Sequence, residues 1–145
     1  MFPASTQPGG VNMTMDPLDT CKTPSSGGPI PIPYAKLVDG KAAANNPAAK
    51  ATQKVIIDEA AAKGYKASSA TQAAIKSNGD EAGTMKGMVS SKNLSTSAYK
   101  TGSSKVMVEG KKISTVTSPT SHNGGSNAPA GTQIAPSQSK VMLGN

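Results

Sequence analysis

Short alternations of apolar and polar residues, separated by turn residues, run along much of the chain and predict short β-strands. The first alternation, Val11 to Met15, follows the turn signal Pro8-Gly9-Gly10. A second brief extended segment is expected from Lys36 to Asp39, closed by Gly40. The pattern therefore predicts a thin β fold with many loops.

Prolines at positions 29, 31 and 33 dominate the next segment, Pro29-Ile30-Pro31-Ile32-Pro33-Tyr34. Each proline fixes φ near −65° and removes a backbone donor, so this segment must be extended rather than helical. Alternate residues of an extended chain point to opposite sides. Ile30, Ile32 and Tyr34 therefore form one apolar row that can pack on something.

A Lys-Val-apolar-apolar pattern occurs three times, at Lys54 to Ile57, Lys105 to Val108 and Lys140 to Leu143. Each copy is bounded by polar residues and predicts a short strand. Gly110 makes a tight hairpin credible after the second copy. The three copies suggest an internal repeat of small β units, although their unequal spacing is unlike a solenoid.

The remaining segments are less regular. Residues 41–52 are expected to be a loop, and residues 69–76 allow a short alanine-rich helix. Residues 117–139 consist almost entirely of Ser, Thr, Gly, Pro and Asn, and predict a long loop before the third Lys-Val strand. A long loop that leads to a closing strand usually has a use.

The 145 residues are enough for one domain, residues 1–145, but only twenty of them are Leu, Ile, Val or Phe. This content is below the roughly one fifth that ordinary cores need. The chain is therefore either disordered or a thin β fold completed by a partner, a metal or oligomerisation. The regular β pattern favours the second interpretation.

All fifteen basic residues are lysine, which gives a net charge of +7 without a single arginine. Specific nucleic-acid binding depends heavily on arginine and on stacked aromatic residues, and this chain has four aromatics, so we expect no nucleic-acid partner. The scattered lysines are expected to be solvated and to protect strand edges. There is no membrane-spanning apolar run and no signal peptide, so we expect synthesis in the cytoplasm and no stable membrane association. If the protein leaves the cell, it does so by a route without a signal peptide.

The single cysteine, Cys21, and the single histidine, His122, are the candidates for chemistry. A Cys–His dyad is formally available, but its flanking residues carry no catalytic signature, and no phosphate-binding loop is present. We therefore expect the protein not to be an enzyme.

A metal site is a better hypothesis for these two residues, because thiolate and imidazole together suit zinc. Such a link between residues 21 and 122 would close a long loop in a fold short of core. Zinc needs four ligands, so Asp16 or Asp19, water or a second chain would have to complete the site. The simpler alternative is a buried thiol and a hydrogen-bonded histidine without metal.

Five ordered motifs resemble the PAAR-like proteins, which form the tips of contractile injection machines such as type VI secretion systems. The motifs are Phe2-Pro3-Ala4-Ser5-Thr6, Asp19-Thr20-Cys21-Lys22-Thr23-Pro24, Pro29-Ile30-Pro31-Ile32-Pro33-Tyr34, Ser118-Pro119-Thr120-Ser121-His122-Asn123-Gly124-Gly125 and Ala135-Pro136-Ser137-Gln138-Ser139-Lys140-Val141. The resemblance implies a small cone of short strands. Its base docks on a trimeric VgrG-type spike, and its apex is stabilised by a metal, usually zinc.

The resemblance also assigns roles to residues. Family sites are described as three histidines and one cysteine, and here only Cys21 and His122 match that description. The three Lys-Val units could form a pseudo-threefold base for a trimeric spike. The candidate partner-binding residues are the apolar residues of these strands and of the proline segment: Ile30, Ile32, Tyr34, Val55, Ile57, Val106, Val108, Val141 and Leu143.

The expected function is that of a structural tip which sharpens the spike for penetration of a target envelope and adapts an effector protein to it. Such a tip would be assembled on the injection machine and delivered outside the cell or into a target cell. Because the chain ends at Asn145, directly after the third Lys-Val strand, no C-terminal effector domain is expected. The alternative is a free-standing zinc-binding, low-complexity binding module that is not part of a machine.

Overall fold

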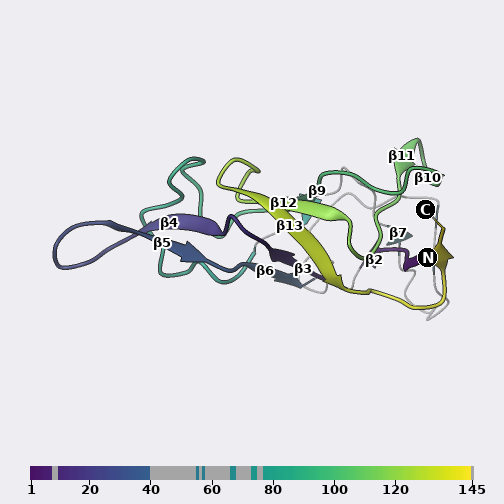
Figure 1. The fold of residues 1–145 in the computed structure, drawn as a ribbon, viewed down its shortest axis with the longest axis horizontal. Coiled ribbons are helices and arrows are strands. Elements are labelled where there is room, and N and C mark those ends of the chain that lie inside the picture. Colours follow the sequence, from purple (N-terminus) through teal and green to yellow (C-terminus); the bar gives the residue numbers. More distant parts are fainter. Residues whose placement is uncertain are drawn as a thin grey trace.

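A computed structural model describes residues 1–7, 10–39, 55, 57, 66–67, 73–74 and 77–144. This part of the chain is built from short strands and loops and contains no helix. It tapers from a wide end, where both termini lie, to a narrow end formed by one hairpin (Figure 1). The predicted mostly β fold is confirmed.

An antiparallel six-stranded sheet forms the middle of the molecule, with the order β6-β3-β13-β12-β9-β8. Two of the strands confirm the expected early elements, β3 (Val11–Thr14) and β6 (Leu37–Asp39). The other four are β8 (Ala73–Ala74), β9 (Ser97–Tyr99), β12 (Pro119–His122) and β13 (Ala128–Ala135).

The narrow end is the hairpin of β4 (Asp19–Thr23) and β5 (Ile30–Tyr34). Cys21 pairs with Ile32, and Pro31 and Pro33 lie opposite Lys22 and Thr20. The proline segment is therefore extended, as its sequence dictates. The other edge of β4 is covered by the segment around residues 83–88, whose backbone exchanges hydrogen bonds of 2.8–3.2 Å with β4.

The wide end combines three short strand pairs. These pairs are β1 (Phe2–Pro3) with β14 (Met142–Leu143), β10 (Met107–Val108) with β11 (Lys111–Lys112), and β2 (Thr6–Gln7) with β7 (Lys66–Ala67). Gly110, at a φ of 75°, forms the expected tight turn between β10 and β11.

A small apolar cluster holds the wide end together. Residues from all three Lys-Val units reach it: Val108 and Leu143 belong to its buried centre with Ala4 and Ile113, and Val55, Ile57 and Val106 pack around it. The three repeated units therefore meet in one place, which explains why they share an apolar pattern.

Two expectations for the less regular segments are wrong. Residues 117–139 contain β12 and β13, the longest strand, because their buried positions are polar and do not show as hydrophobic alternation. Within the segment for which a helix was considered, Ala73 and Ala74 pair with β9 as a strand. The rest of that segment, the expected loop at residues 41–52, and Lys54 and Ile56 lie outside the described residues.

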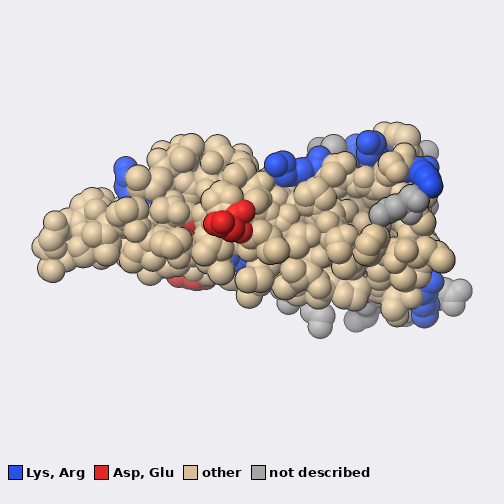
Figure 2. Space-filling view, in the orientation of Figure 1, with Lys and Arg blue, Asp and Glu red and all other residues tan. Residues whose placement is uncertain are grey.

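The interior of the molecule is largely polar. Most of the largest wholly buried side chains are polar or charged, among them Lys36, His122 and Gln133, whereas Ile113 is the one large aliphatic residue in this group. Hydrogen bonds must therefore stabilise this fold in the way that a larger apolar core stabilises other proteins. On the face shown in Figure 2, lysines gather at the wide end, and the narrow end carries few charges. Among the described residues, no helix is long and apolar enough to span a membrane.

Candidate functional site: a buried ionic network

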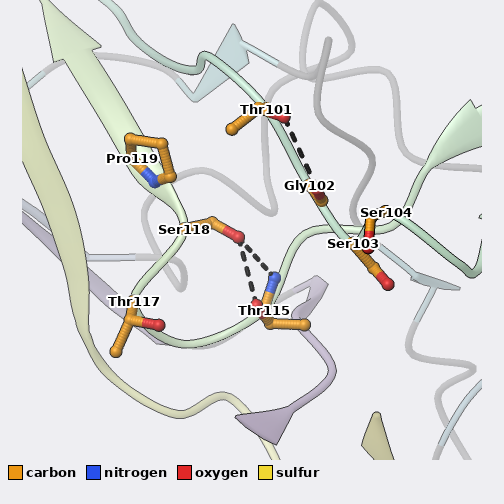
Figure 3. Close-up of a pocket in the computed structure, with 8 residues that line it drawn as sticks. All are labelled: Thr101, Gly102, Ser103, Ser104, Thr115, Thr117, Ser118 and Pro119. Carbon is orange, nitrogen blue, oxygen red and sulfur yellow. Dashed lines mark hydrogen bonds between the residues drawn. The ribbon is translucent and has the colours of Figure 1, made fainter. Parts of the chain in front are cut away.

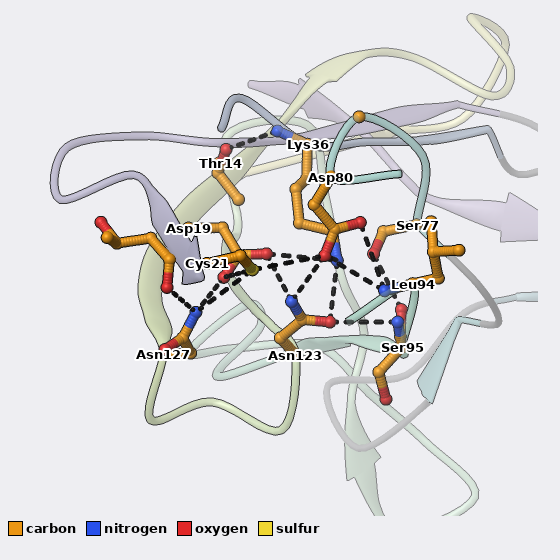
Figure 4. A network of polar contacts seen from close by, with 12 residues as sticks. Thr14, Asp19, Cys21, Lys36, Ser77, Asp80, Leu94, Ser95, Asn123 and Asn127 are labelled. Carbon is orange, nitrogen blue, oxygen red and sulfur yellow. Dashed lines mark hydrogen bonds and ion pairs between the residues drawn. The ribbon is translucent and has the colours of Figure 1, made fainter. Parts of the chain in front are cut away.

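A cluster of charged and amide side chains fills the interior where the hairpin joins the sheet (Figure 4). Its members come from four separate segments, and each is buried. They are Asp19 and Cys21 on β4, Lys36 between β5 and β6, Asp80 in the turn after Asn78, and Asn123 and Asn127 between β12 and β13.

Backbone contacts bring Lys36 and Asp80 together. The Lys36 amide donates to Thr14 Oγ1 at 2.8 Å, and its carbonyl accepts from the Thr14 amide at 3.0 Å. The next residue, Leu37, exchanges two 2.8 Å hydrogen bonds with Asn78. Gly79 then turns the chain with a φ of 122°, and a Cβ there would lie 2.2 Å from the Ala35 carbonyl oxygen. Glycine is therefore required for the turn that positions Asp80.

The Lys36 ammonium lies between three oxygen atoms. Its Nζ is 2.9 Å from Asp80 Oδ2, 2.8 Å from Asn123 Oδ1 and 3.3 Å from Asp19 Oδ2. The side chains of Lys36 and of both aspartates have no exposed surface. A buried charge is tolerated only with partners of this kind.

Two asparagines complete the hydrogen bonds of the carboxylates. Asn123 Nδ2 donates to Asp19 Oδ2 and, at 3.0 Å, to Asp80 Oδ2, and Asn127 Nδ2 donates to Asp19 Oδ1. The backbone amide of Leu94 also donates to Asp80, at 3.1 and 3.2 Å. Every ionic group in the network is thus hydrogen-bonded within the protein.

Burial and hydrogen bonding shift the pKa values of the two carboxyl groups in opposite directions. Burial raises the pKa of Asp19 above its ordinary value, and the hydrogen bond from Asn127 and the charge of Lys36 offset only part of this. Burial would also raise the pKa of Asp80, but hydrogen bonds from Lys36, Asn123 and the Leu94 amide lower it below its ordinary value. Asp80 is therefore the principal counter-ion of Lys36.

The Cys21 thiol donates a long hydrogen bond to each of the two carboxylates. Its Sγ is 3.8 Å from Asp19 Oδ1 and from Asp80 Oδ2, and Gly83 packs directly over it. Burial, followed by the negative charges of Asp19 and Asp80, raises the pKa of the thiol to about 12. The thiol is therefore protonated at neutral pH, which is the opposite of what a nucleophile needs.

His122, the second residue predicted from sequence, is also wholly buried. Its Nε2 lies 3.3 Å from Thr120 Oγ1, whereas its Nδ1 has no hydrogen-bond partner. Burial, with the charge of Lys36, lowers the pKa of His122 to about 4, so the imidazole is neutral. The next residue, Asn123, belongs to the network through its hydrogen bond to Asp19.

The ligand atoms of Asp19, Cys21 and Asp80 all lie within 4.8 Å of one another, so their spacing alone is that of a buried metal-binding group. Asp19 is one of the two carboxylates that the sequence offered as a further ligand, whereas Asp16 is exposed. His122 is not part of this group. The Lys36 ammonium already contacts both carboxylates, so the group as it stands does not fit a metal ion.

The predicted partner-binding residues lie at the two ends of the molecule. Ile30, Ile32 and Tyr34 lie on β5, in the hairpin at the narrow end. The remaining six lie at the wide end, in or beside the apolar cluster: Val55, Ile57, Val106, Val108, Val141 and Leu143. One flat base cannot include both groups, because the proline row belongs to the opposite end.

A cavity of about 320 Å³ lies elsewhere, between residues 101–104, 115 and 117–119 (Figure 3). Its wall is rich in hydroxyl groups, and the Thr115 amide donates to Ser118 Oγ at 2.9 Å. None of its lining residues is ionisable. None of these residues could act as the general base that a Ser or Thr hydroxyl needs to become a nucleophile.

The sequence analysis missed four members of the network: Lys36, Asp80, Asn123 and Asn127. Lys36 lies two residues after the end of the proline motif, and Asn123 lies within the motif that contains His122. Their closeness to these motifs was a signal that sequence analysis could have used. Asp80 lies in an ordinary turn sequence, Ser77-Asn78-Gly79-Asp80, that points equally to a surface loop. No local pattern could have shown that it is buried.

Comparison with known proteins agrees with the resemblance seen in the motifs. Residues 12–130 match the family described as the toxin PAAR-like domain. No curated protein and no solved structure matches the chain significantly. The matched region contains the hairpin, the buried network and most of the six-stranded sheet, and the chain therefore belongs to the toxin PAAR-like domain family.

Proposed function

We propose that this protein is the structural tip of a contractile injection machine, and that its wide end caps a trimeric VgrG-type spike. The observation that carries the proposal is the tapered β structure of a PAAR-like chain, with a hairpin at one end and an apolar cluster at the other. A tip of this kind acts mechanically: the narrow end concentrates the force of contraction, and the wide end receives it.

The narrow end is built to resist deformation. The β4–β5 hairpin has two prolines within one strand, is paired along five residue pairs, and is bound on its other edge by the segment around residues 83–88. Below it, Lys36 links Asp19 on β4 to Asp80, and Asn123 links Asp19 to the β12–β13 connection. Fixed dihedrals and internal hydrogen bonds both reduce flexibility, as a penetrating tip requires.

The wide end offers a docking surface beside the apolar cluster. Next to the apolar cluster, Met107 is 60% exposed, Met142 44% and Val141 37%. Lys111 and Lys112 are exposed on the neighbouring strand β11, so the surface combines apolar side chains with positive charge. Burying these apolar side chains against a spike would add the packing that the small cluster lacks.

The proposed role needs no catalytic chemistry. Cys21 is protonated and covered, His122 is neutral and makes no hydrogen bond to it, and the hydroxyl-lined cavity contains no ionisable group. These features support a structural protein rather than an enzyme. Zinc, which the sequence resemblance implied, is not part of the proposed mechanism, because Lys36 lies where a metal would contact the carboxylates.

As a tip, the protein would be assembled in the cytoplasm and carried out of the cell with the spike. The narrow end would then serve as the adaptor for a separate effector protein. Both points extend the proposal from the role of the family and rest on the spike interaction.

Two matched variants test the docking surface. Val141→Asp places a charge on a 37% exposed side chain at the wide end, and Ile30→Asp does the same to a 46% exposed side chain at the narrow end. The readout is co-purification of each variant with the cognate trimeric spike protein, after thermal unfolding has shown that both variants fold. We expect Val141→Asp to lose the spike and Ile30→Asp to retain it. Retention by Val141→Asp, or loss only with Ile30→Asp, would contradict docking through the wide end.

A further inference from the structure

We propose that Lys36 takes the place of a metal ion in this tip: its ammonium group is a cation built into the chain, and the protein binds no metal there. The proposal concerns the isolated chain and does not depend on the spike partner. It accounts for two observations: the donor set expected from the PAAR resemblance is incomplete, and the buried ammonium group of Lys36 lies among Asp19, Asp80 and Asn123.

The surroundings of Lys36 match the chemistry of an ammonium group. A lysine side chain has three N–H donors and no acceptor. Three oxygens, from Asp80, Asn123 and Asp19, lie 2.8–3.3 Å from Nζ. All three acceptor residues are wholly buried, so no water is needed to satisfy the ammonium group. The number of acceptors equals the number of donors.

The asparagine amides are oriented for this arrangement. The Ser95 backbone amide donates to Asn123 Oδ1 at 3.0 Å, which fixes that oxygen toward Lys36 and the Asn123 NH₂ group toward the carboxylates. The Val89 amide likewise donates to Asn127 Oδ1 at 2.9 Å, which turns the Asn127 NH₂ group toward Asp19. Hydrogen-bond donors therefore face the carboxylate oxygens that a metal ion would need.

A metal ion would have to displace these donors. Asp80 Oδ2 accepts from both Lys36 and Asn123, and the two oxygens of Asp19 accept from Asn123 and Asn127. A divalent ion bound to the same oxygens would also lie beside the positive charge of Lys36 in a site closed to water, where charges repel strongly. With Lys36 in place, the hydrogen bonds of the network are all formed, whereas a bound metal would break some of them.

Lys36 also does the structural work that a metal does in a small fold. Through its side chain it joins segments 44 residues away at Asp80 and 87 residues away at Asn123, and it pairs with Asp19 on β4. Such contacts close long loops that the few apolar side chains cannot hold. Because the cation is part of the chain, the tip would remain stapled where zinc is scarce or removed by chelators.

The first test measures the intact chain. The protein is purified, incubated with excess zinc or with EDTA, desalted, and analysed for metal by mass spectrometry and for thermal unfolding. We expect no stoichiometric zinc after either treatment and the same Tm in both samples. About one zinc per chain, together with a lower Tm after EDTA, would overturn the proposal.

The second test uses a matched pair of lysine variants. Lys36→Met keeps an unbranched side chain, one atom shorter, and removes its charge, and Lys22→Met makes the same change at an exposed position on β4. We expect Lys36→Met to lower Tm by about 10 °C relative to Lys22→Met, because two buried carboxyl groups lose their cation. Equal Tm values for the two variants would overturn the proposal. If Lys36→Met does not fold, the metal measurement on the unmodified chain still decides.

Discussion

Lys36 Nζ lies 2.9 Å from Asp80 Oδ2, and neither side chain has any surface exposed to solvent. This pair connects the segment that follows the proline hairpin to a turn that is 44 residues away in sequence. Removing one partner of this pair leaves the charge of the other uncompensated, whereas removing both avoids that cost and leaves only Asp19 without its cation. The pair should therefore behave as a unit in mutagenesis.

We predict that Asp80→Asn lowers the free energy of unfolding by about 3–5 kcal/mol, the usual cost of breaking a buried ion pair. The double variant Lys36→Met/Asp80→Asn should lose less than the sum of the two single changes. Chemical denaturation of the four proteins measures the coupling. Additive losses would mean that the two side chains do not stabilise each other.

The packing of Gly83 against Cys21 gives a second prediction. A Cβ at Gly83 would lie 2.5 Å from Cys21 Cβ, which is too close for any relaxed contact. Gly83→Ala should therefore lower the free energy of unfolding by about 1–3 kcal/mol, as expected for an overpacked interior.

Gly27→Ala is the control for this change. Gly27 lies in the hairpin loop, and a Cβ there would have no atom within 4 Å. The free energy of unfolding of Gly27→Ala should therefore match that of the unmodified protein. Equal denaturation midpoints for Gly83→Ala and Gly27→Ala would show that the segment over Cys21 moves away easily, and would contradict a closed interior.

The burial of Cys21 gives a third prediction. The thiol has no exposed surface, and burial and the two nearby carboxylates raise its pKa to about 12. It should therefore not react with a thiol reagent such as dithionitrobenzoate at neutral pH, but should react stoichiometrically in denaturant. The rate of labelling in the folded protein should follow the rate of unfolding. Fast labelling of the folded protein would contradict the buried, protonated thiol and would reopen the possibility of a reactive cysteine.

The fold could be predicted where local chemistry decides the backbone. The prolines at 29, 31 and 33 leave only an extended conformation, and the Lys-Val units are short apolar runs with polar borders. The strands β12 and β13 could not be predicted in this way. Their inward-facing positions include Thr120, His122 and Gln133, so their burial is achieved by hydrogen bonds and leaves no hydrophobic period in the sequence.

The candidate site could be predicted only in part for the same reason. Cys21 stood out because it is unique, and Asp19 was named, with Asp16, as a carboxylate that could complete a metal site. Lys36 was one of fifteen lysines, all expected to be solvated, and that expectation is wrong for Lys36. Its burial depends on Asp80 and Asn123, which come together through the topology of the sheet and not through any spacing in the sequence.

The last prediction concerns pH and follows from His122. Burial and the Lys36 charge lower the pKa of this imidazole from 6.5 to about 4 in the folded protein, so between these values the unfolded chain binds a proton that the folded protein does not. The free energy of unfolding should therefore be highest above about pH 6.5 and decrease by about 3 kcal/mol as the pH falls toward 4. His122 is the only histidine, so His122→Asn should flatten this part of the profile, although it also changes the packing beside Thr120. The measurement is the denaturation midpoint as a function of pH. Because the raised pKa of Asp19 acts on both proteins alike, a His122→Asn variant with the same pH profile as the unmodified protein between pH 6.5 and 4.5 would contradict a buried neutral histidine.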